Sequence, residues 1–221
     1  MLLRPDAPHP LGSGYVRDFV LNDAEWNYYD FNYSIVQLAD RLDPGNATAA
    51  DFDLSPFQRK GGKLLHYHGL SDGLIPTGSS MYFYKQVLQT LKAQGIALDP
   101  WYRFFLVPGM QHCSGTPTNM NAPWYFAGAT QAGAIGVDPG SVHGVPGFGD
   151  REHDALLALM AWTENGTAPD RIIATKWRND TLTDVVERQR PLCPYPTQAR
   201  YNGSGDPDRA ESWSCKSLYD L

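Results

Sequence analysis

The residues Gly-Gly-Lys-Leu-Leu-His-Tyr-His-Gly-Leu-Ser-Asp-Gly-Leu-Ile-Pro, at positions 61–76, decide the fold that the sequence predicts. Residues 63–67 form a short run with glycine on both sides, which is typical of a buried strand. Asp72 follows just beyond the end of this run, in a loop marked by glycine and proline. We therefore expect a carboxylate at the C-terminal end of a sheet strand.

A helix and a second strand are expected to follow this loop. Ser79 or Ser80 is suited to cap the helix, and Gly95 is its expected stop. The apolar side chains at helical spacing are Met81, Tyr84, Leu88 and Leu91. Residues 101–107 form a second strand-like run, and His112 lies in the turn after it. The pattern predicts a β-α-β unit.

Asp72 and His112 are expected to meet at one edge of the sheet. Parallel strands joined by a helix are normally neighbours, roughly 4.8 Å apart, so the loops after them open on the same rim. The two residues can therefore touch although 40 positions separate them (112 − 72). An aspartate that orients a histidine base is two thirds of a hydrolytic triad. Spacing alone leaves an alternative open, in which Asp72 caps a turn and His112 is a hydrogen-bonded loop residue.

The same stretch, together with Val-Pro-Gly-Met-Gln-His-Cys at positions 107–113, resembles the fungal tannase and feruloyl esterase family. The resemblance runs from about residue 53 to the C-terminus and, more weakly, through residues 12–39. It implies a secreted serine esterase, with Asp72 as the triad acid and His112 as the triad base. It also implies that Cys113 pairs with a cysteine beside the nucleophilic serine.

The fold class expected from this resemblance is α/β. We expect the C-terminal part of an α/β-hydrolase fold, with parallel strands and helices, plus a remnant of an inserted lid domain. Residues 1–55 would be the end of the lid and a linker, and residues 56–221 the C-terminal part of the catalytic domain. Lids of the family bind calcium, but no calcium ligands are identifiable in this sequence, so no cofactor is expected.

The nucleophilic serine of the family has no counterpart in this sequence. The serines before Asp72 are Ser13, Ser34, Ser55 and Ser71, and none is a credible nucleophile. Ser13, for example, lacks the first glycine of Gly-x-Ser-x-Gly and has no strand before it. We therefore expect an esterase whose serine segment is missing and a chain that is inactive alone. The alternatives are a catalytically incomplete fragment that self-associates or pairs with an N-terminal esterase segment, and a non-enzymatic module that binds phenolic ligands.

The composition of the chain limits the classes of partner that it can bind. The chain has 221 residues, 42% of them hydrophobic, and a net charge of −6 without a basic cluster, which argues against nucleic acid. No apolar run approaches the roughly 18 residues of a membrane span. A small phenolic ester is the expected substrate. Five glycosylation sequons weakly favour a secreted glycoprotein; they begin at Asn32, Asn46, Asn165, Asn179 and Asn202.

The three cysteines indicate the same compartment. Cys193 and Cys215 flank a tail rich in proline, glycine and aspartate, which has little core-forming character. A disulfide between them would contribute roughly 3 kcal/mol by loop closure. Cys113 is then left over, and its partner is expected to be missing from the chain. The alternative from the sequence alone is a small buried core thiol.

Three side chains are candidate substrate contacts. His68 is expected at the rim near Asp72, and Trp124 and Tyr125 belong to a long loop, residues 114–149, of the kind that often lines a site. The two rings could stack on a phenolic acyl group, or they could be packing anchors for the loop. His66 is expected in the core. A zinc site of His66, His68 and His112 is a weaker interpretation, since no glutamate base accompanies them.

The remaining elements are expected after this loop. Asp150 is suited to cap a helix that ends at Asn165-Gly166. A strand is expected over residues 171–177. With about three strands in all, the sheet would be too small for a complete hydrolase and would expose an unpaired edge.

Overall fold

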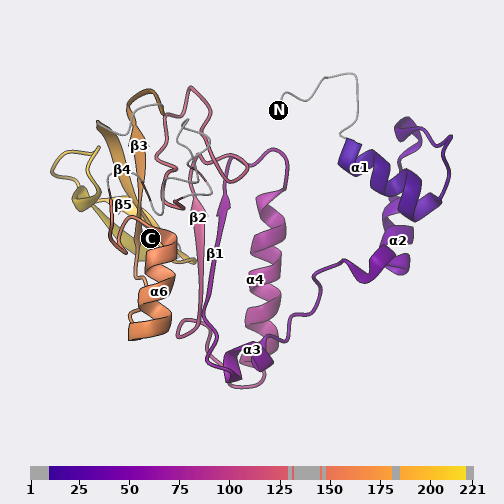
Figure 1. The fold of residues 1–221 in the computed structure, drawn as a ribbon, viewed down its shortest axis with the longest axis horizontal. Coiled ribbons are helices and arrows are strands. Elements are labelled where there is room, and N and C mark those ends of the chain that lie inside the picture. Colours follow the sequence, from indigo (N-terminus) through magenta and orange to yellow (C-terminus); the bar gives the residue numbers. More distant parts are fainter. Residues whose placement is uncertain (1–9, 129–130, 132–144, 146–147, 181–184, 218–221) are drawn as a thin grey trace. The chain divides into compact units, whose positions relative to one another are not determined.

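The computed structural model describes residues 10–128, 131, 145, 148–180 and 185–217 (Figure 1). The chain divides into two compact units, Met1–Asp51 and Phe52–Leu221. This division falls four positions before the expected boundary at residue 55 (55 − 51). The origin of the first unit in an inserted lid stays a prediction.

The first unit is helical and has a small core. Its longest described helix, α2 (Tyr33–Leu42), begins after Asn32, which caps it by accepting a hydrogen bond from the Ser34 N–H. Before α2 lie α1 (Pro10–Gly14) and a π-helical turn, Tyr15–Leu21. Two 3-10 turns complete the unit, at Tyr28–Asp30 and Pro44–Asn46. The buried apolar side chains are Val16, Val20 and Ile35.

The second unit contains the expected β-α-β unit. β1 (Leu64–Gly69) pairs in parallel with β2 (Tyr102–Val107), and α4 (Thr77–Lys92) connects them (Figure 1). In this register the last residues of the two strands are partners, so both strands end at the same rim. Among the described residues β1 pairs with no strand other than β2, which leaves the other edge of β1 without a strand partner.

Helix α4 differs from the expectation in its start and in its buried stripe. Pro76 occupies the N-cap position, so neither Ser79 nor Ser80 caps the helix. Ser80 instead turns toward the sheet. Leu88 is 38% exposed, because the helix places a neighbouring row against the sheet. The buried row consists of Tyr84, Val87 and Leu91.

The two faces of the β1–β2 pair carry separate clusters, because successive side chains of a strand point to opposite faces. One face packs against α4, and the other packs against α6 (Ala155–Asn165) and β3 (Ile172–Trp177). The apolar side chains of the two strands on the α4 face are Leu64, Tyr102, Phe104 and Leu106. Those on the opposite face are Leu65, Tyr67, Phe105 and Val107.

Helix α6 and strand β3 lie close to their expected positions. Asp154 caps α6, by accepting hydrogen bonds from the N–H groups of Leu156 and Leu157. The expectation that Asp150 caps this helix is wrong. Asp150 accepts from the N–H groups of Glu152 and His153 and so closes the turn just before α6.

The tail contains more structure than its composition predicts. β4 (Val186–Leu192) pairs antiparallel with β3, and β5 (Thr197–Tyr201) pairs antiparallel with β6 (Trp213–Ser217). The expected disulfide Cys193–Cys215 is present and ties β6 to the end of β4. A bridge between Phe105 and Pro194 attaches this region to β2. Residues 193–217 therefore form regular structure, although only Cys193, Tyr195, Ala210 and Ser212 of them are buried.

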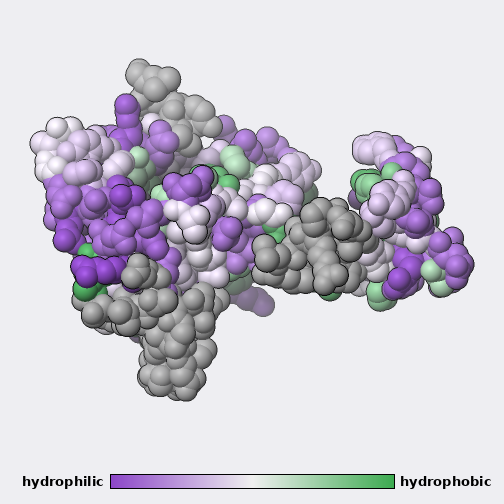
Figure 2. All heavy atoms as spheres, turned by 90° about the horizontal axis from the view of Figure 1, so that it is seen from above, coloured by the Kyte–Doolittle hydropathy of each residue, from purple (hydrophilic) through white to green (hydrophobic). Residues whose placement is uncertain are grey.

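The surface is consistent with the composition. The face seen in Figure 2 is largely hydrophilic and carries small, separate hydrophobic patches. Within the described ranges no helix is both long enough and apolar enough to cross a membrane. A parallel pair of strands with a helix against each face is an α/β arrangement.

Candidate active site

Asp72 and His112 form a hydrogen-bonded pair where β1 and β2 end. His112 Nδ1 donates to Asp72 Oδ2 at 3.0 Å. The two loops are also joined directly, because the Ser71 N–H donates to the Met110 carbonyl oxygen at 3.0 Å. The expected meeting of these two side chains is confirmed.

The environment of Asp72 keeps its carboxylate ionised. The side chain is 2% exposed, and burial by itself raises its pKa. Hydrogen bonds from the N–H groups of Ile75 and Leu74 and from His112 outweigh burial and hold the pKa of Asp72 at about 2. At neutral pH Asp72 therefore only accepts hydrogen bonds.

This acceptor fixes the tautomer of His112. Nδ1 must carry the proton that it donates to the carboxylate, so neutral His112 leaves Nε2 free to accept a proton. The His112 side chain is 49% exposed, whereas its partner Asp72 is buried. A buried acid behind an accessible imidazole is the arrangement that a general base requires.

Gly69, the last residue of β1, allows the two loops to approach. A β-carbon at this position would collide with the Met110 carbonyl oxygen and would lie 2.7 Å from the Gln111 carbonyl oxygen. These atoms belong to the backbone just before His112 and cannot move like a flexible side chain. The absence of a side chain at Gly69 thus lets the His112 loop lie against β1.

Gln131 holds the segment that follows His112, a role that no sequence pattern indicates. Its side chain is fully buried, and Oε1 accepts hydrogen bonds from the N–H groups of Phe126 and Ala127 at 2.8 and 2.9 Å. Nε2 donates to the carbonyl oxygens of Cys113 and Trp124 at 3.0 and 2.9 Å. One side chain therefore joins the residue after His112 to the Trp124–Ala127 stretch.

Trp124 and Tyr125 are core residues in this structure. They are 1% and 0% exposed, and a bridge between Tyr125 and Thr175 attaches their segment to β3. Fully buried rings cannot stack on a ligand, so the substrate-contact interpretation of these two residues is wrong and the packing alternative holds. Part of the loop to which they belong, including residues 132–144, lies outside the described residues.

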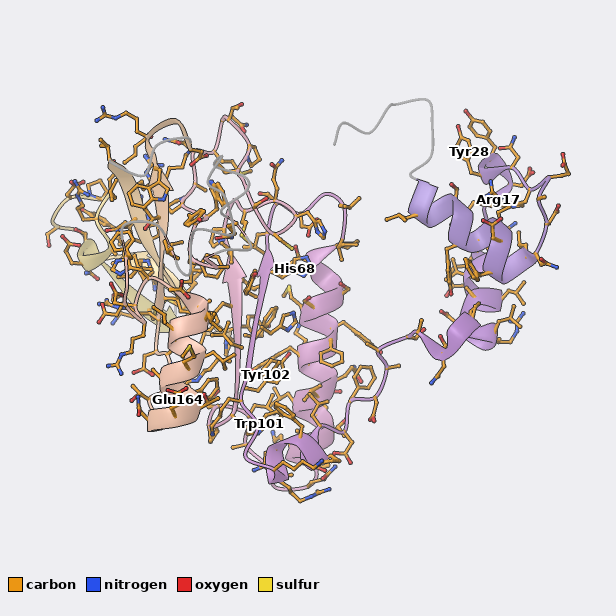
Figure 3. The ribbon with its side chains drawn as sticks, in the orientation of Figure 1. Arg17, Tyr28, His68, Trp101, Tyr102 and Glu164 are labelled. Atoms are coloured by element: carbon orange, nitrogen blue, oxygen red, sulfur yellow. A yellow bond between two sulfur atoms is a disulfide. The ribbon has the colours of Figure 1, made fainter. Side chains whose placement is uncertain are left out.

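His68 lies beside Asp72, as expected for the rim. Its Nε2 is 3.2 Å from Asp72 Oδ2, and its side chain is 10% exposed. His66 lies deeper, where burial lowers its pKa to about 4. Figure 3 shows His68 and Tyr102 on the side of the strand pair that faces α4. Within the part of the chain that the structure describes, no three His, Cys, Asp or Glu side chains are grouped to hold a metal ion.

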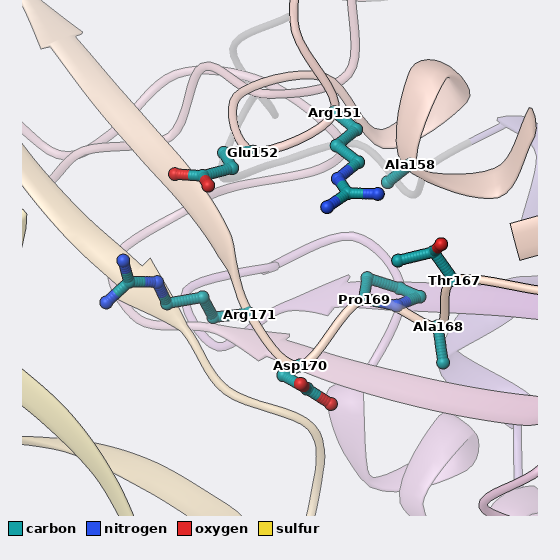
Figure 4. A pocket seen from close by; sticks show the side chains of 8 residues that line it. All are labelled: Arg151, Glu152, Ala158, Thr167, Ala168, Pro169, Asp170 and Arg171. Carbon is teal, nitrogen blue, oxygen red and sulfur yellow. The ribbon is translucent and has the colours of Figure 1, made fainter. Parts of the chain in front are cut away.

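A small hollow of about 80 Å³ opens at this pair. Its lining residues are Tyr67, His68, Gly69, Asp72, Ile75, Met110, His112 and Cys113. A larger hollow of about 210 Å³ lies around Arg151 and Arg171, and Figure 4 shows the Arg151 guanidinium reaching toward Thr167 and Pro169. It shares no residue with the first hollow and contains no histidine or cysteine.

Cys113 follows His112 directly and has a free thiol. It is exposed and has a positive φ of 62°, which turns the chain at this point. Burial of part of the thiol and the negative charge of Asp72 raise the pKa of Cys113. The alternative of a buried core thiol is wrong, since the side chain reaches the surface beside the acid–base pair.

Sequence comparisons relate the chain to known esterases. The family model "Tannase and feruloyl esterase" matches residues 18–216. The chain is 34% identical over 208 residues to "Probable feruloyl esterase B-1" of Aspergillus oryzae, and 33% identical over 208 residues to "Probable feruloyl esterase B-2" of Aspergillus terreus. Each alignment covers 94% of this chain but only 35% and 36% of those proteins. The chain thus spans about a third of the length of these curated relatives.

Solved structures show the same relationship. The crystal structure of feruloyl esterase B from Aspergillus oryzae superposes with a TM-score of 0.79 at 30% identity, over 95% of this chain and 38% of that one. Tannin acyl hydrolase from Aspergillus niger shares the fold, with a TM-score of 0.61 at 23% identity, over 93% of this chain and 33% of that one. Both neighbours agree with an α/β-hydrolase-like fold. From the family match over most of its length, the chain belongs to the tannase and feruloyl esterase family.

Proposed function

We propose that this chain supplies the acid and the base of a carboxylic ester hydrolase that releases phenolic acids from their esters. Esters of ferulate-like acids are the first choice, and gallate esters are the second. The observation that carries the proposal is the 3.0 Å hydrogen bond from the accessible His112 to the buried Asp72. The family membership and the names of the relatives support the substrate class.

The proposed mechanism is a two-step acyl transfer. His112 Nε2 takes the proton of a serine hydroxyl while the serine oxygen attacks the ester carbonyl carbon, and backbone N–H groups stabilise the oxyanion. His112 then gives that proton to the departing alcohol, which leaves an acyl-serine. Water repeats the sequence and releases the phenolic acid. Asp72 stabilises the imidazolium in both steps through the bond to Nδ1.

We propose that the nucleophilic serine belongs to a segment outside these 221 residues. The exposed Cys113 thiol next to His112 is well placed for a disulfide to a cysteine beside that serine, as the family resemblance implies. The unpaired edge of β1 offers a place for a further strand. Ser80 contacts His68, but it does not line the hollow at His112, so we assign it no nucleophilic role.

Secretion and glycosylation are part of the proposal. The Cys193–Cys215 disulfide forms and persists in oxidising compartments. Four of the sequon asparagines are exposed, namely Asn32, Asn46, Asn165 and Asn202. The side chain of the fifth, Asn179, lies outside the described residues. The expectation that no cofactor binds also stays a prediction.

The test compares this chain with a hybrid protein. In the hybrid, the chain replaces the part of the Aspergillus oryzae feruloyl esterase B-1 that it matches, so that the relative supplies the serine. We expect the hybrid to hydrolyse methyl ferulate faster than methyl gallate, and the chain alone to hydrolyse neither. Binding of both esters by the chain without hydrolysis by the hybrid would favour the non-enzymatic binding module. Hydrolysis by the chain alone would show that a nucleophile lies within the 221 residues.

A further inference from the structure

The side chains behind Asp72 form a continuous line of hydrogen bonds that the proposed mechanism does not use. We propose that His68 is a positioning residue for Asp72, and that Ser80, His66 and Tyr102 hold His68 in a single tautomer. This inference rests on the proposed function, in which Asp72 is the triad acid. It adds a second histidine to the site, one that acts on the acid rather than on the substrate.

The contacts of His68 Nε2 determine where its proton lies. Nε2 is 3.2 Å from Asp72 Oδ2 and 3.1 Å from the Ile75 carbonyl oxygen. An ionised carboxylate and a carbonyl oxygen can only accept hydrogen bonds. Nε2 must therefore carry a proton, whichever charge state His68 adopts.

The contacts on the other side of the ring agree with this tautomer. Ser80 Oγ lies 2.7 Å from His68 Nδ1 and 3.1 Å from His66 Nε2, and His66 Nδ1 lies 2.9 Å from Tyr102 Oη. Tyr102 is fully buried, and burial raises the pKa of its phenol, so Tyr102 stays protonated and can donate. His66 is neutral at pH 7, because burial lowers its pKa to about 4.

One direction of donation satisfies every group in the line. Tyr102 donates to His66 Nδ1, His66 Nε2 donates to Ser80, and Ser80 donates to His68 Nδ1. His68 Nε2 then donates to the Ile75 carbonyl oxygen and lies 3.2 Å from Asp72 Oδ2, the oxygen that accepts the His112 proton. With this direction of donation His66 and His68 each donate from Nε2 and accept on Nδ1, and neither leaves a buried polar atom without a partner.

The strand register explains why these residues meet. His66, His68 and Tyr102 stand at even positions of β1 and β2, which face α4. Ser80 lies in the first turn of α4 and points to the same face. The line thus joins three elements of the second unit and ends at the loop of Asp72.

The consequence is a carboxylate that is held on both oxygens. Oδ1 accepts from two backbone N–H groups, and Oδ2 accepts from His112 and lies 3.2 Å from His68 Nε2. The His68 contact with the Ile75 carbonyl oxygen also closes the loop that contains Asp72. A carboxylate fixed in this way orients the His112 ring before substrate binds, which is how supporting residues improve the geometry of a catalytic group.

The first experiment measures histidine tautomers in the wild-type 221-residue chain by 15N NMR at pH 7. We expect the proton on Nε2 in His66 and His68, and on Nδ1 in His112. A proton on Nδ1 of His68, with Nε2 bare, would overturn the inference because Nε2 would then present no proton to the Ile75 carbonyl oxygen or to Asp72 Oδ2. If His112 still carried its proton on Nδ1 in that case, the proposed function would stand, so the two failures are distinguishable.

Two variants separate a positioning role from simple packing. In His68→Gln, the amide nitrogen can take the place of Nε2 beside Asp72 Oδ2, whereas in His68→Asn the shorter amide can keep the Ser80 contact but not reach Asp72. The readout is the carboxyl 13C titration of Asp72, which faces His112, His68 and Cys113. We expect the proton affinity of Asp72 to rise roughly tenfold in His68→Asn and to change little in His68→Gln. Equal changes in the two variants, or no change in His68→Asn, would contradict a role through Asp72.

Discussion

A 3.0 Å hydrogen bond joins His112 Nδ1 to Asp72 Oδ2 across 40 positions of sequence (112 − 72). The parallel register of β1 and β2 makes this contact possible, because both strands end at one rim. Each residue follows one of these strands, so the acid–base pair depends on the packing of two loops rather than on one local motif.

The low pKa of Asp72 links the site to stability. Its folded-state pKa of about 2 lies below the ordinary value of 3.8, so the stabilisation is present above pH 4 and is lost as pH falls toward 2. We expect Asp72→Asn to lower the free energy of unfolding at pH 7 by up to about 2 kcal/mol. The difference in the free energy of unfolding between Asp72→Asn and wild type should be smaller at pH 2. Urea unfolding at both pH values checks this, and a deficit that grows at low pH would contradict it.

Substitution of Gly69 tests whether the His112–Asp72 contact requires the close approach of the two loops. A β-carbon there meets backbone oxygens of Met110 and Gln111, whereas one at Gly73 meets nothing within 4 Å. We expect Gly69→Ala to cost roughly 1–3 kcal/mol of stability and to break the His112–Asp72 contact, and Gly73→Ala to be near neutral. Thermal unfolding and the NMR signal of the His112 Nδ1 proton measure the two effects. Equal behaviour of the two variants would show that the close approach is unimportant.

Substitution of Gln131 tests whether its side chain holds the segment after His112 in place. Gln131→Leu removes the acceptor of two N–H groups and the donor to two carbonyl oxygens in a buried place. Each unsatisfied buried group costs roughly 1–3 kcal/mol, so we expect a loss of at least about 2 kcal/mol. Gln89→Leu, on the exposed side of α4, is the matched control and should stay within about 0.5 kcal/mol of wild type. Denaturant unfolding gives both values.

The reactivity of the Cys113 thiol tests the electrostatic effect of the Asp72 carboxylate. Partial burial and the negative carboxylate both raise the pKa of the thiol above 9.0, so we expect slow alkylation by iodoacetamide at pH 8 and faster alkylation above pH 9. Asp72→Asn removes one of the two causes and should speed the reaction at pH 8. Mass spectrometry should find the label on Cys113, with Cys193 and Cys215 unlabelled. A slower reaction in Asp72→Asn would contradict this electrostatic assignment.

The sequence predicted the β-α-β unit and the acid–base pair because both depend on local signals. Glycine-bounded strand runs and the residue just after each strand are readable without a structure. The Cys193–Cys215 disulfide was also predictable, since two cysteines flank one segment of the tail. The helix boundaries were predicted less accurately. Helix α4 begins at Thr77, and its Ser80 contacts His68 instead of capping the helix.

Long-range packing explains what the sequence could not predict. Trp124 and Tyr125 are buried because their segment pairs with Thr175, about 50 residues later in the chain (175 − 125). Gln131 reaches Cys113 across 18 positions, and no periodicity marks that contact. His68 was expected near Asp72, but its line of partners through Ser80 becomes visible only when α4 lies against β1.

The kcat of the hybrid protein for methyl ferulate, measured with and without His112→Ala, tests the central claim most directly. The claim is that His112, oriented by Asp72, is the base of an ester hydrolase. It predicts a loss of at least roughly 10³-fold in kcat with little change in KM. Unchanged hydrolysis by the His112→Ala hybrid would contradict the claim.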